Sequence, residues 1–189
     1  MKTCREYMNQ MEAVPFTQGI EYRSTGMWPH PEQLPKAVHS LHNCRDSIVR
    51  IPPKVTNSWN RQVPVISVSK KAFRGNETVT DILLPRTISA IAEGAFAGCK
   101  NLQRITIPKA VRSIWEGTFE GCASLEDVYY EGSPEEWEQV YIVHERHEIE
   151  FGPLIPGTPV DEVAAERRIH IPGNDALLMA NIHFYCGLG

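Results

Sequence analysis

The sequence lacks the features that mark several large classes of protein. Its 19 Lys and Arg residues are outnumbered by 23 Asp and Glu, and no basic run occurs, so composition gives no reason to expect nucleic-acid binding. No apolar run is long enough to span a bilayer, and the first residues lead into no apolar stretch, so the chain as written carries no secretory signal. The P-loop, Gly-x-Gly-x-x-Gly and Gly-x-Ser-x-Gly motifs are absent. The 189 residues, 42% of them apolar, are sufficient for one domain with a core.

Cysteine is scarce and forms no Cys-x-x-Cys pair. An odd number without such pairs argues against a disulfide framework or a zinc knuckle. Cys99 and Cys122 are 23 residues apart, and we expect both to remain reduced and to point inward as small apolar residues. The five cysteines are Cys4, Cys44, Cys99, Cys122 and Cys186.

The same interval of 23 residues recurs throughout the middle of the chain, which is the sign of a repeat architecture. Two and a half units are clear, and Ile51-Pro52 marks the start of an earlier, irregular unit. The residues in one register include Phe73, Phe96 and Phe119, and also Gly75, Gly98 and Gly121.

The spacing within one unit predicts a short strand, a return run and a tight closure. Leu102, Ile105 and Ile107 follow the pattern L-x-x-I-x-I, whose last two residues point to one face of a strand. Pro108 ends that strand because it cannot donate to a ladder. Such a unit cannot bury its apolar side alone, so stacked units must share a continuous core. The sequence therefore predicts a solenoid of parallel strands.

The pattern from Ile105 to Leu125 resembles the BspA-like leucine-rich repeats, which occur widely in bacterial, often surface-exposed proteins. Residues 128–137 are similar to the segment that often ends such arrays, and residues 173–184 are similar to their final strand. The resemblance implies a right-handed leucine-rich-repeat solenoid with a parallel concave sheet. Residues 141–167 depart from the family pattern and are read as a side insertion, so we expect an α/β, strand-rich solenoid with short helical turns and a side insertion. It implies binding rather than catalysis, usually of proteins or host surface molecules, and it supplies no single active-site motif. We expect no cofactor.

We expect one continuous domain in four parts: an N-terminal capping segment (1–47), the repeat array (48–140), an insertion (141–167), and the last strands with the C-terminal cap (168–189). The apolar spacing in residues 32–41 is a modest helix signal. Ser133-Pro134 begins a short helix with a capping box, and residues 159–167 are predicted to form another. Residues 168–172 are predicted to return to the array as a strand.

Stacking in register places equivalent outward residues in columns about 4.8 Å apart. The first column alternates in charge, which fits a self-neutralising ladder or a ligand-facing polar stripe. It reads Asp81, Arg104, Asp127, Arg168.

The second column is the better candidate for a binding surface, because Tyr and Arg are common interface anchors. The alternative is an ordinary exposed sheet face, which also favours aromatic and β-branched residues. The predicted partner-binding residues from both columns are Arg50, Leu83, Arg104, Thr106, Asp127, Tyr129, His170 and His183.

Histidines suggest three metal-site candidates, none of which we favour. His170 and His183 would be neighbours if their strands paired, but no third ligand falls in that column, and zinc requires four ligands or three with water. The segment from His144 to Glu148 and the cluster of His39, His42 and Cys44 are more simply solvated surface.

Three functions remain, and we favour the first: a non-catalytic recognition module that binds a protein or glycan partner through the concave sheet or the insertion. The second is a structural protein that self-associates, as a homodimer, through an open end of the solenoid. The third is an enzyme that uses the insertion. The first predicts an exposed patch that includes Tyr129 and its neighbours, and this hypothesis would be lost if the N-terminal segment or the insertion covered that face.

Overall fold

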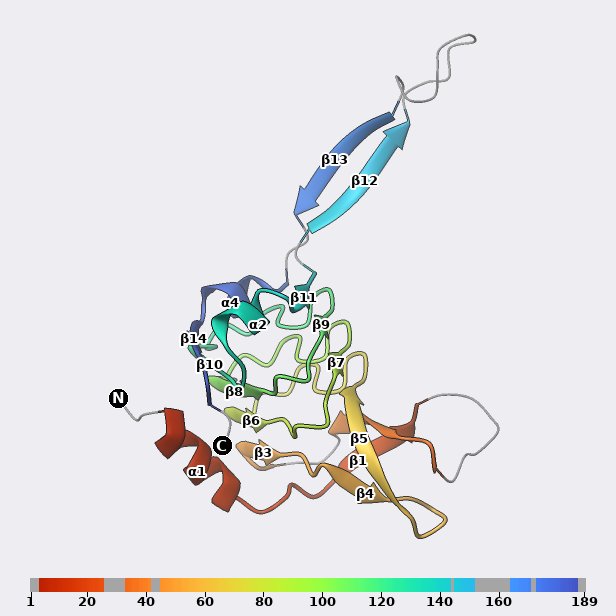
Figure 1. Cartoon of the computed structure of the whole chain (residues 1–189), viewed down its shortest axis with the longest axis vertical. Coiled ribbons are helices and arrows are strands. Elements are labelled where there is room, and N and C mark those ends of the chain that lie inside the picture. The colour runs from red at the N-terminus through yellow and green to blue at the C-terminus, as the bar shows by residue number, and fades with distance from the viewer. Residues whose placement is uncertain are drawn as a thin grey trace.

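The computed structural model describes residues 4–25, 33–41, 45–143, 145–151, 164–170 and 173–186. Figure 1 shows a stack of short coils, with helix α1 (Cys4–Ala13) beside the strands at one side of the stack and a two-stranded hairpin that projects away from it.

A parallel five-stranded sheet carries one strand from each coil. Its order is β14-β10-β8-β6-β3, so the last strand of the chain pairs with β10. Asp81 lies opposite Arg104, and Arg104 lies opposite Asp127, which is the predicted step of 23 residues. This sheet is the one expected to be concave. Its strands are β3 (Ile48–Arg50), β6 (Asp81–Leu83), β8 (Arg104–Ile107), β10 (Asp127–Tyr130) and β14 (Asn181–His183).

A second sheet of seven strands contains the return runs. Its order is β1-β2-β5-β7-β9-β11, with β4 paired to β5. Ser67, Ala90 and Ser113 lie opposite one another in successive coils, again 23 residues apart. The strands are β1 (Ile20–Ser24), β2 (Lys36–Leu41), β4 (Lys54–Thr56), β5 (Gln62–Val68), β7 (Ala90–Ile91), β9 (Ser113–Ile114) and β11 (Tyr141–Ile142).

The core of the stack is a spine of phenylalanines, as predicted. The ring centroids of Phe73 and Phe96 are 5.1 Å apart, and those of Phe96 and Phe119 are 5.4 Å apart. Cys99 and Cys122 are free and buried, and each thiol donates to a carbonyl oxygen of the preceding coil. Burial raises the pKa of Cys99 to about 11 and that of Cys122 to about 12. Their inward, reduced role is therefore confirmed.

Asn174 closes the core at the C-terminal end of the stack. Its side chain is fully buried, donates to the carbonyl oxygens of Trp115 and Val143, and accepts from the backbone N–H of Phe119. It precedes helix α4 (Asp175–Met179), which leads into β14. The predicted capping box at Ser133 is also present, at the start of helix α2 (Pro134–Trp137).

The helix predicted in residues 32–41 is wrong, because strand β2 forms there. Strand β2 pairs with β1 on one side and with β5 on the other, and these two sets of backbone hydrogen bonds outweigh a weak helical spacing. Helix α1, which the sequence analysis did not predict, lies earlier in the N-terminal capping segment, at Cys4–Ala13.

The insertion forms an antiparallel hairpin of β12 (Glu145–Phe151) and β13 (Ala164–His170). The helix predicted over residues 159–167 is therefore wrong at 164–167, and residues 159–163 lie outside the described residues. The predicted strand around 168–172 is wrong in its pairing, because β13 pairs with β12, and β14 takes the place beside β10.

Candidate functional site

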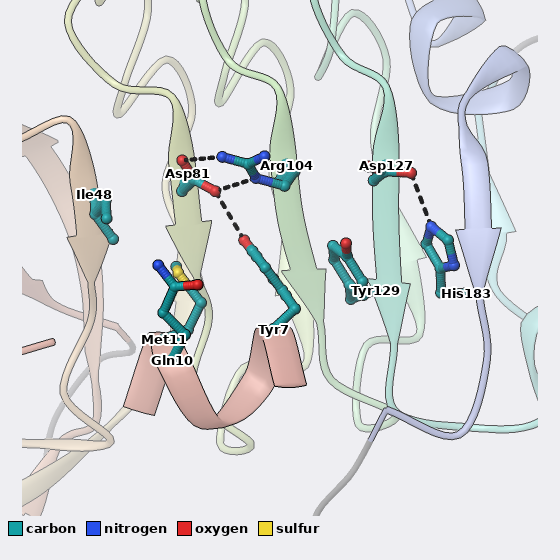
Figure 2. A pocket seen from close by; sticks show the side chains of 9 residues that line it. All are labelled: Tyr7, Gln10, Met11, Ile48, Asp81, Arg104, Asp127, Tyr129 and His183. Carbon is teal, nitrogen blue, oxygen red and sulfur yellow. Dashed lines mark hydrogen bonds and ion pairs between the residues drawn. The ribbon is translucent and has the colours of Figure 1, made fainter. Parts of the chain in front are cut away.

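Helix α1 lies across the five-stranded sheet. Its Tyr7, Met8 and Met11 side chains are buried and pack in a cluster with Leu83 and Tyr129 of the sheet. Figure 2 shows the helix against strands β6 and β8, with Tyr7 pointing toward the first residues of those strands.

Asp81 is the polar centre of this contact. The Tyr7 hydroxyl donates to its Oδ1 over 3.1 Å, and the Arg104 guanidinium donates to both carboxylate oxygens. Thr80 adds a hydrogen bond of 2.7 Å to Oδ2. Burial and the Asp81 charge together raise the pKa of Tyr7 well above its usual range. The carboxylate is therefore fully engaged, and Tyr7 remains a neutral donor.

Three aromatic rings form a ladder along the sheet. Tyr7 stacks on Tyr129 with centroids 4.0 Å apart, and Tyr129 stacks on His183 with centroids 4.7 Å apart. The Nε2 atom of His183 lies 2.8 Å from Oδ1 of Asp127. A carboxylate thus holds each end of the ladder, Asp81 at Tyr7 and Asp127 at His183 (Figure 2).

A pocket of about 290 Å³ lies beside α1, over the first residues of strands β6, β8 and β10. The side chains of Arg104, Asp127 and His183 are partly exposed in it, at 37%, 26% and 36%. The pocket offers hydrogen-bond donors and acceptors beside aromatic side chains. Its lining residues are Tyr7, Gln10, Met11, Ile48, Asp81, Arg104, Asp127, Tyr129 and His183.

The predicted charge column is present for Asp81, Arg104 and Asp127. Its pairing is less regular than predicted, because Arg104 binds Asp81 while Asp127 binds His183. Arg168 does not belong to the column, since it lies in the hairpin opposite His147.

The second column is in register from Arg50 through Leu83, Thr106 and Tyr129 to His183. The expectation that it is exposed is wrong at its centre, so recognition through an open patch around Tyr129, as the sequence predicted it, is lost. Leu83, Thr106 and Tyr129 are only 7%, 1% and 5% accessible. Helix α1 covers Leu83 and Tyr129, and the Thr106 hydroxyl accepts a hydrogen bond from the backbone N–H of Leu84.

Arg50 also contacts α1 and the residues after it. Its Nη1 donates to the carbonyl oxygens of Glu12 and Val14 over 2.7 and 2.8 Å, and its guanidinium lies over the Phe16 ring. A cation at the last carbonyls of a helix satisfies acceptors that have no intrahelical donor. Arg50 thus fixes the C-terminal end of α1 on the sheet.

His170 and His183 are not neighbours, so the predicted pairing is wrong. His170 lies opposite Glu145 in the hairpin, and His183 lies opposite Tyr129. His144, His42 and Cys44 lie outside the described residues. Within the part of the chain that the structure describes, no group of three or more His, Cys, Asp or Glu could hold a metal ion. None of the described helices is long and apolar enough to cross a membrane.

Sequence reasoning missed α1 and one disulfide. The spacing of Tyr7, Met8 and Met11 at i, i+1 and i+4 is a helical pattern that could have revealed the buried face of α1. Cys186, in the same cluster, is disulfide-bonded, which the argument against a disulfide framework did not anticipate.

Stacked coils with a 23-residue step, each with one strand in the five-stranded parallel sheet, are the architecture of a leucine-rich-repeat protein. Residues 49–141 match the family model described as "BspA type Leucine rich repeat region", in six copies. The repeat array of this chain therefore belongs to the BspA-type leucine-rich-repeat family, as the resemblance indicated.

Solved structures with similar folds are bacterial leucine-rich-repeat proteins. One from T. pallidum is 25% identical over 60% of this chain and 51% of its own, with a TM-score of 0.47. One from Bacteroides ovatus is 30% identical over 60% of this chain and 30% of its own, with a TM-score of 0.49. A leucine-rich cell surface protein from Faecalibacterium prausnitzii is 19% identical over 69% of this chain and 42% of its own, with a TM-score of 0.30. The chain thus spans about half or less of these proteins. No curated protein sequence matches it.

Proposed function

We propose that this protein is a non-catalytic recognition module that binds a protein partner through the pocket beside α1. The observation that carries the proposal is the group of partly exposed side chains Arg104, Asp127 and His183 around the buried Tyr129 ring. Arg and aromatic side chains in a partly desolvated setting are the usual anchors of protein interfaces.

Two features of the pocket support this class of function. The Asp81 carboxylate is held by Arg104, Tyr7 and Thr80, which favours a structural role for this group over proton transfer. Tyr129 has one face against Tyr7 and the other against His183, so it offers no open ring on which a sugar could stack. A protein partner therefore fits the pocket better than a glycan.

The test is a binding screen with the full-length protein on immobilised extracellular proteins and purified glycans. The Asp127→Asn variant retains the size of the side chain but removes its charge, and we expect it to lose about tenfold in affinity for a bound protein. Glu93→Gln, which removes a carboxylate from an exposed ion pair with Lys70 outside the pocket, is the matched control and should bind like the wild type.

Equal affinity of the wild type and the Asp127→Asn variant would contradict the proposal. Binding to glycans alone, or to nothing on the panel, would also count against it. Cell-surface location, which the Faecalibacterium protein's description gives for that protein, is part of the proposal for this chain.

A further inference from the structure

Helix α1 is held on the five-stranded sheet by a small cluster of its own. The cluster of Tyr7, Met8 and Met11 with Leu83 and Tyr129 shares no residue with the large core of the repeats. If α1 left the sheet, the small cluster would open while the repeat core stayed buried.

The surface of the sheet beneath α1 contacts both the apolar side and the C-terminal end of the helix. Leu83 and Tyr129 supply the apolar floor, and Asp81 accepts the hydroxyl hydrogen of Tyr7. Arg50 donates to the carbonyl oxygens of Glu12 and Val14, which an isolated helix leaves unpaired. Together these contacts select for a helix with an amphipathic face and a free C-terminal end.

The helix itself contributes little to its own stability. Helix α1 has ten residues, and a peptide of this length is marginally helical in water. Its order therefore depends on the sheet, so another helix with the same contacts can compete with it for that surface.

We propose that the surface formed by Arg50, Asp81, Leu83 and Tyr129 is a docking site for an amphipathic helix of a partner protein, and that α1 occupies this site until the partner displaces it. The partner helix carries a tyrosine, followed at the next and the fourth positions by long apolar side chains. This inference goes beyond the proposed function, because it concerns the surface beneath α1 rather than the pocket beside it, three of whose lining residues belong to α1.

Occupation by α1 lowers the apparent affinity of any competing helix, because only the fraction of molecules with an open site can bind it. Weakening α1 in the intact chain must therefore strengthen binding of an added helix. Tyr7 is the residue to change, because it supplies both the ring stack and the hydroxyl contact while leaving the sheet unaltered.

The probe is a fluorescent peptide with the sequence of residues 5–15, added to full-length protein and followed by fluorescence anisotropy. Dithiothreitol is present because Cys186 of the same cluster is disulfide-bonded. We expect the Tyr7→Ala protein to bind the peptide at least about tenfold more tightly than the wild type. A peptide with alanine in place of its tyrosine should bind neither protein. Tyr141→Ala, which changes an exposed tyrosine of the other sheet, should behave like the wild type.

Hydrogen exchange on the wild type provides a second measurement that needs no variant. Excess peptide should accelerate exchange of the α1 amides several-fold and leave those of β8 unchanged. The proposal would be overturned if the peptide did not bind, or if it bound the wild type and the Tyr7→Ala protein with equal affinity. It would also be overturned if the peptide with alanine in place of tyrosine bound as tightly as the original peptide. A concentration-dependent dimer that Tyr7→Ala abolishes would assign the site to α1 of a second copy and would also overturn it. The Asp127→Asn comparison leaves α1 in place, so the two tests can fail separately.

Discussion

Replacing Asn174 by alanine tests how the C-terminal end of the solenoid is closed. The change removes two hydrogen bonds donated to Trp115 and Val143 and one accepted from Phe119. Two of these groups keep other partners, because the Trp115 carbonyl still accepts from Thr118 Oγ1 at 2.6 Å and the Phe119 N–H still donates to the Gly173 carbonyl at 2.9 Å. The cost therefore falls mainly on the Val143 carbonyl.

A carbonyl that loses its donor costs about 1–3 kcal/mol when it is buried, and the carbonyl of Val143, a half-buried residue, falls toward the lower end of that range. Each lost hydrogen bond whose other group keeps a partner costs less. We expect Asn174→Ala to lower the free energy of unfolding by about 2–4 kcal/mol. Asn101→Ala is the matched control, because Asn101 also donates to a backbone carbonyl, that of Glu77, but is exposed. Its expected loss is below about 1 kcal/mol. Urea unfolding followed by circular dichroism measures both.

The Asn174→Asp variant should make the stability of the protein depend on pH in a predictable direction. Its carboxylate would face the Trp115 and Val143 carbonyls in a buried site, so the folded pKa must rise above the unfolded value of about 3.9. The variant is then most stable below a pH of about 3.9, where the acid is protonated in both states, and it loses stability as the pH rises through the folded pKa. The gap in stability between wild type and variant should widen from pH 4 to pH 7. A gap independent of pH, or equal losses for Asn174→Ala and Asn101→Ala, would refute the reasoning.

Three further outcomes follow from the core and from α1. Phe96→Ala should lower stability by about 3–5 kcal/mol in urea unfolding, because the ring is fully buried between two others, whereas Trp115→Ala, half exposed, should cost far less. Cys99 and Cys122, whose pKa values burial raises to about 11 and about 12, should react with Ellman's reagent at neutral pH only after unfolding. The pKa of Tyr7 is raised in the folded state, so the stability that this residue contributes should be lost as the pH rises above about 10. The Tyr7→Phe variant has no such hydroxyl to ionise, so its stability should fall less over the same pH range. Thermal unfolding at several pH values measures both.

Local spacing was sufficient to predict the repeat array. The interval between Phe73, Phe96 and Phe119 predicted a spine whose rings are now 5.1 and 5.4 Å apart. The outward register of Asp81, Arg104 and Asp127 followed from the same interval. These predictions hold because stacked coils impose one geometry on every unit, so each unit repeats the information of the others.

The candidate site was predictable only in part. The prediction that Tyr129 and His183 lie in one column is confirmed, whereas the predictions that His170 joins this column and that the column is exposed are wrong. Residues 168–172 and 181–183 have similar apolar spacing, and nothing local decides which of them pairs with β10. Likewise, the short amphipathic pattern at Tyr7 does not say which surface it covers.

By itself the sequence determined the class of protein, the 23-residue step, the inward Phe and Cys residues and the outward columns of the sheet. Only the tertiary structure decided that α1 covers Leu83 and Tyr129, that Tyr7 reaches Asp81, and that β14 completes the sheet beside β10. The reason is the range of the interactions. Periodicity records contacts between neighbouring coils at a fixed separation, whereas a contact between residues 74 positions apart, such as that of Tyr7 with Asp81, leaves no repeating pattern in the chain.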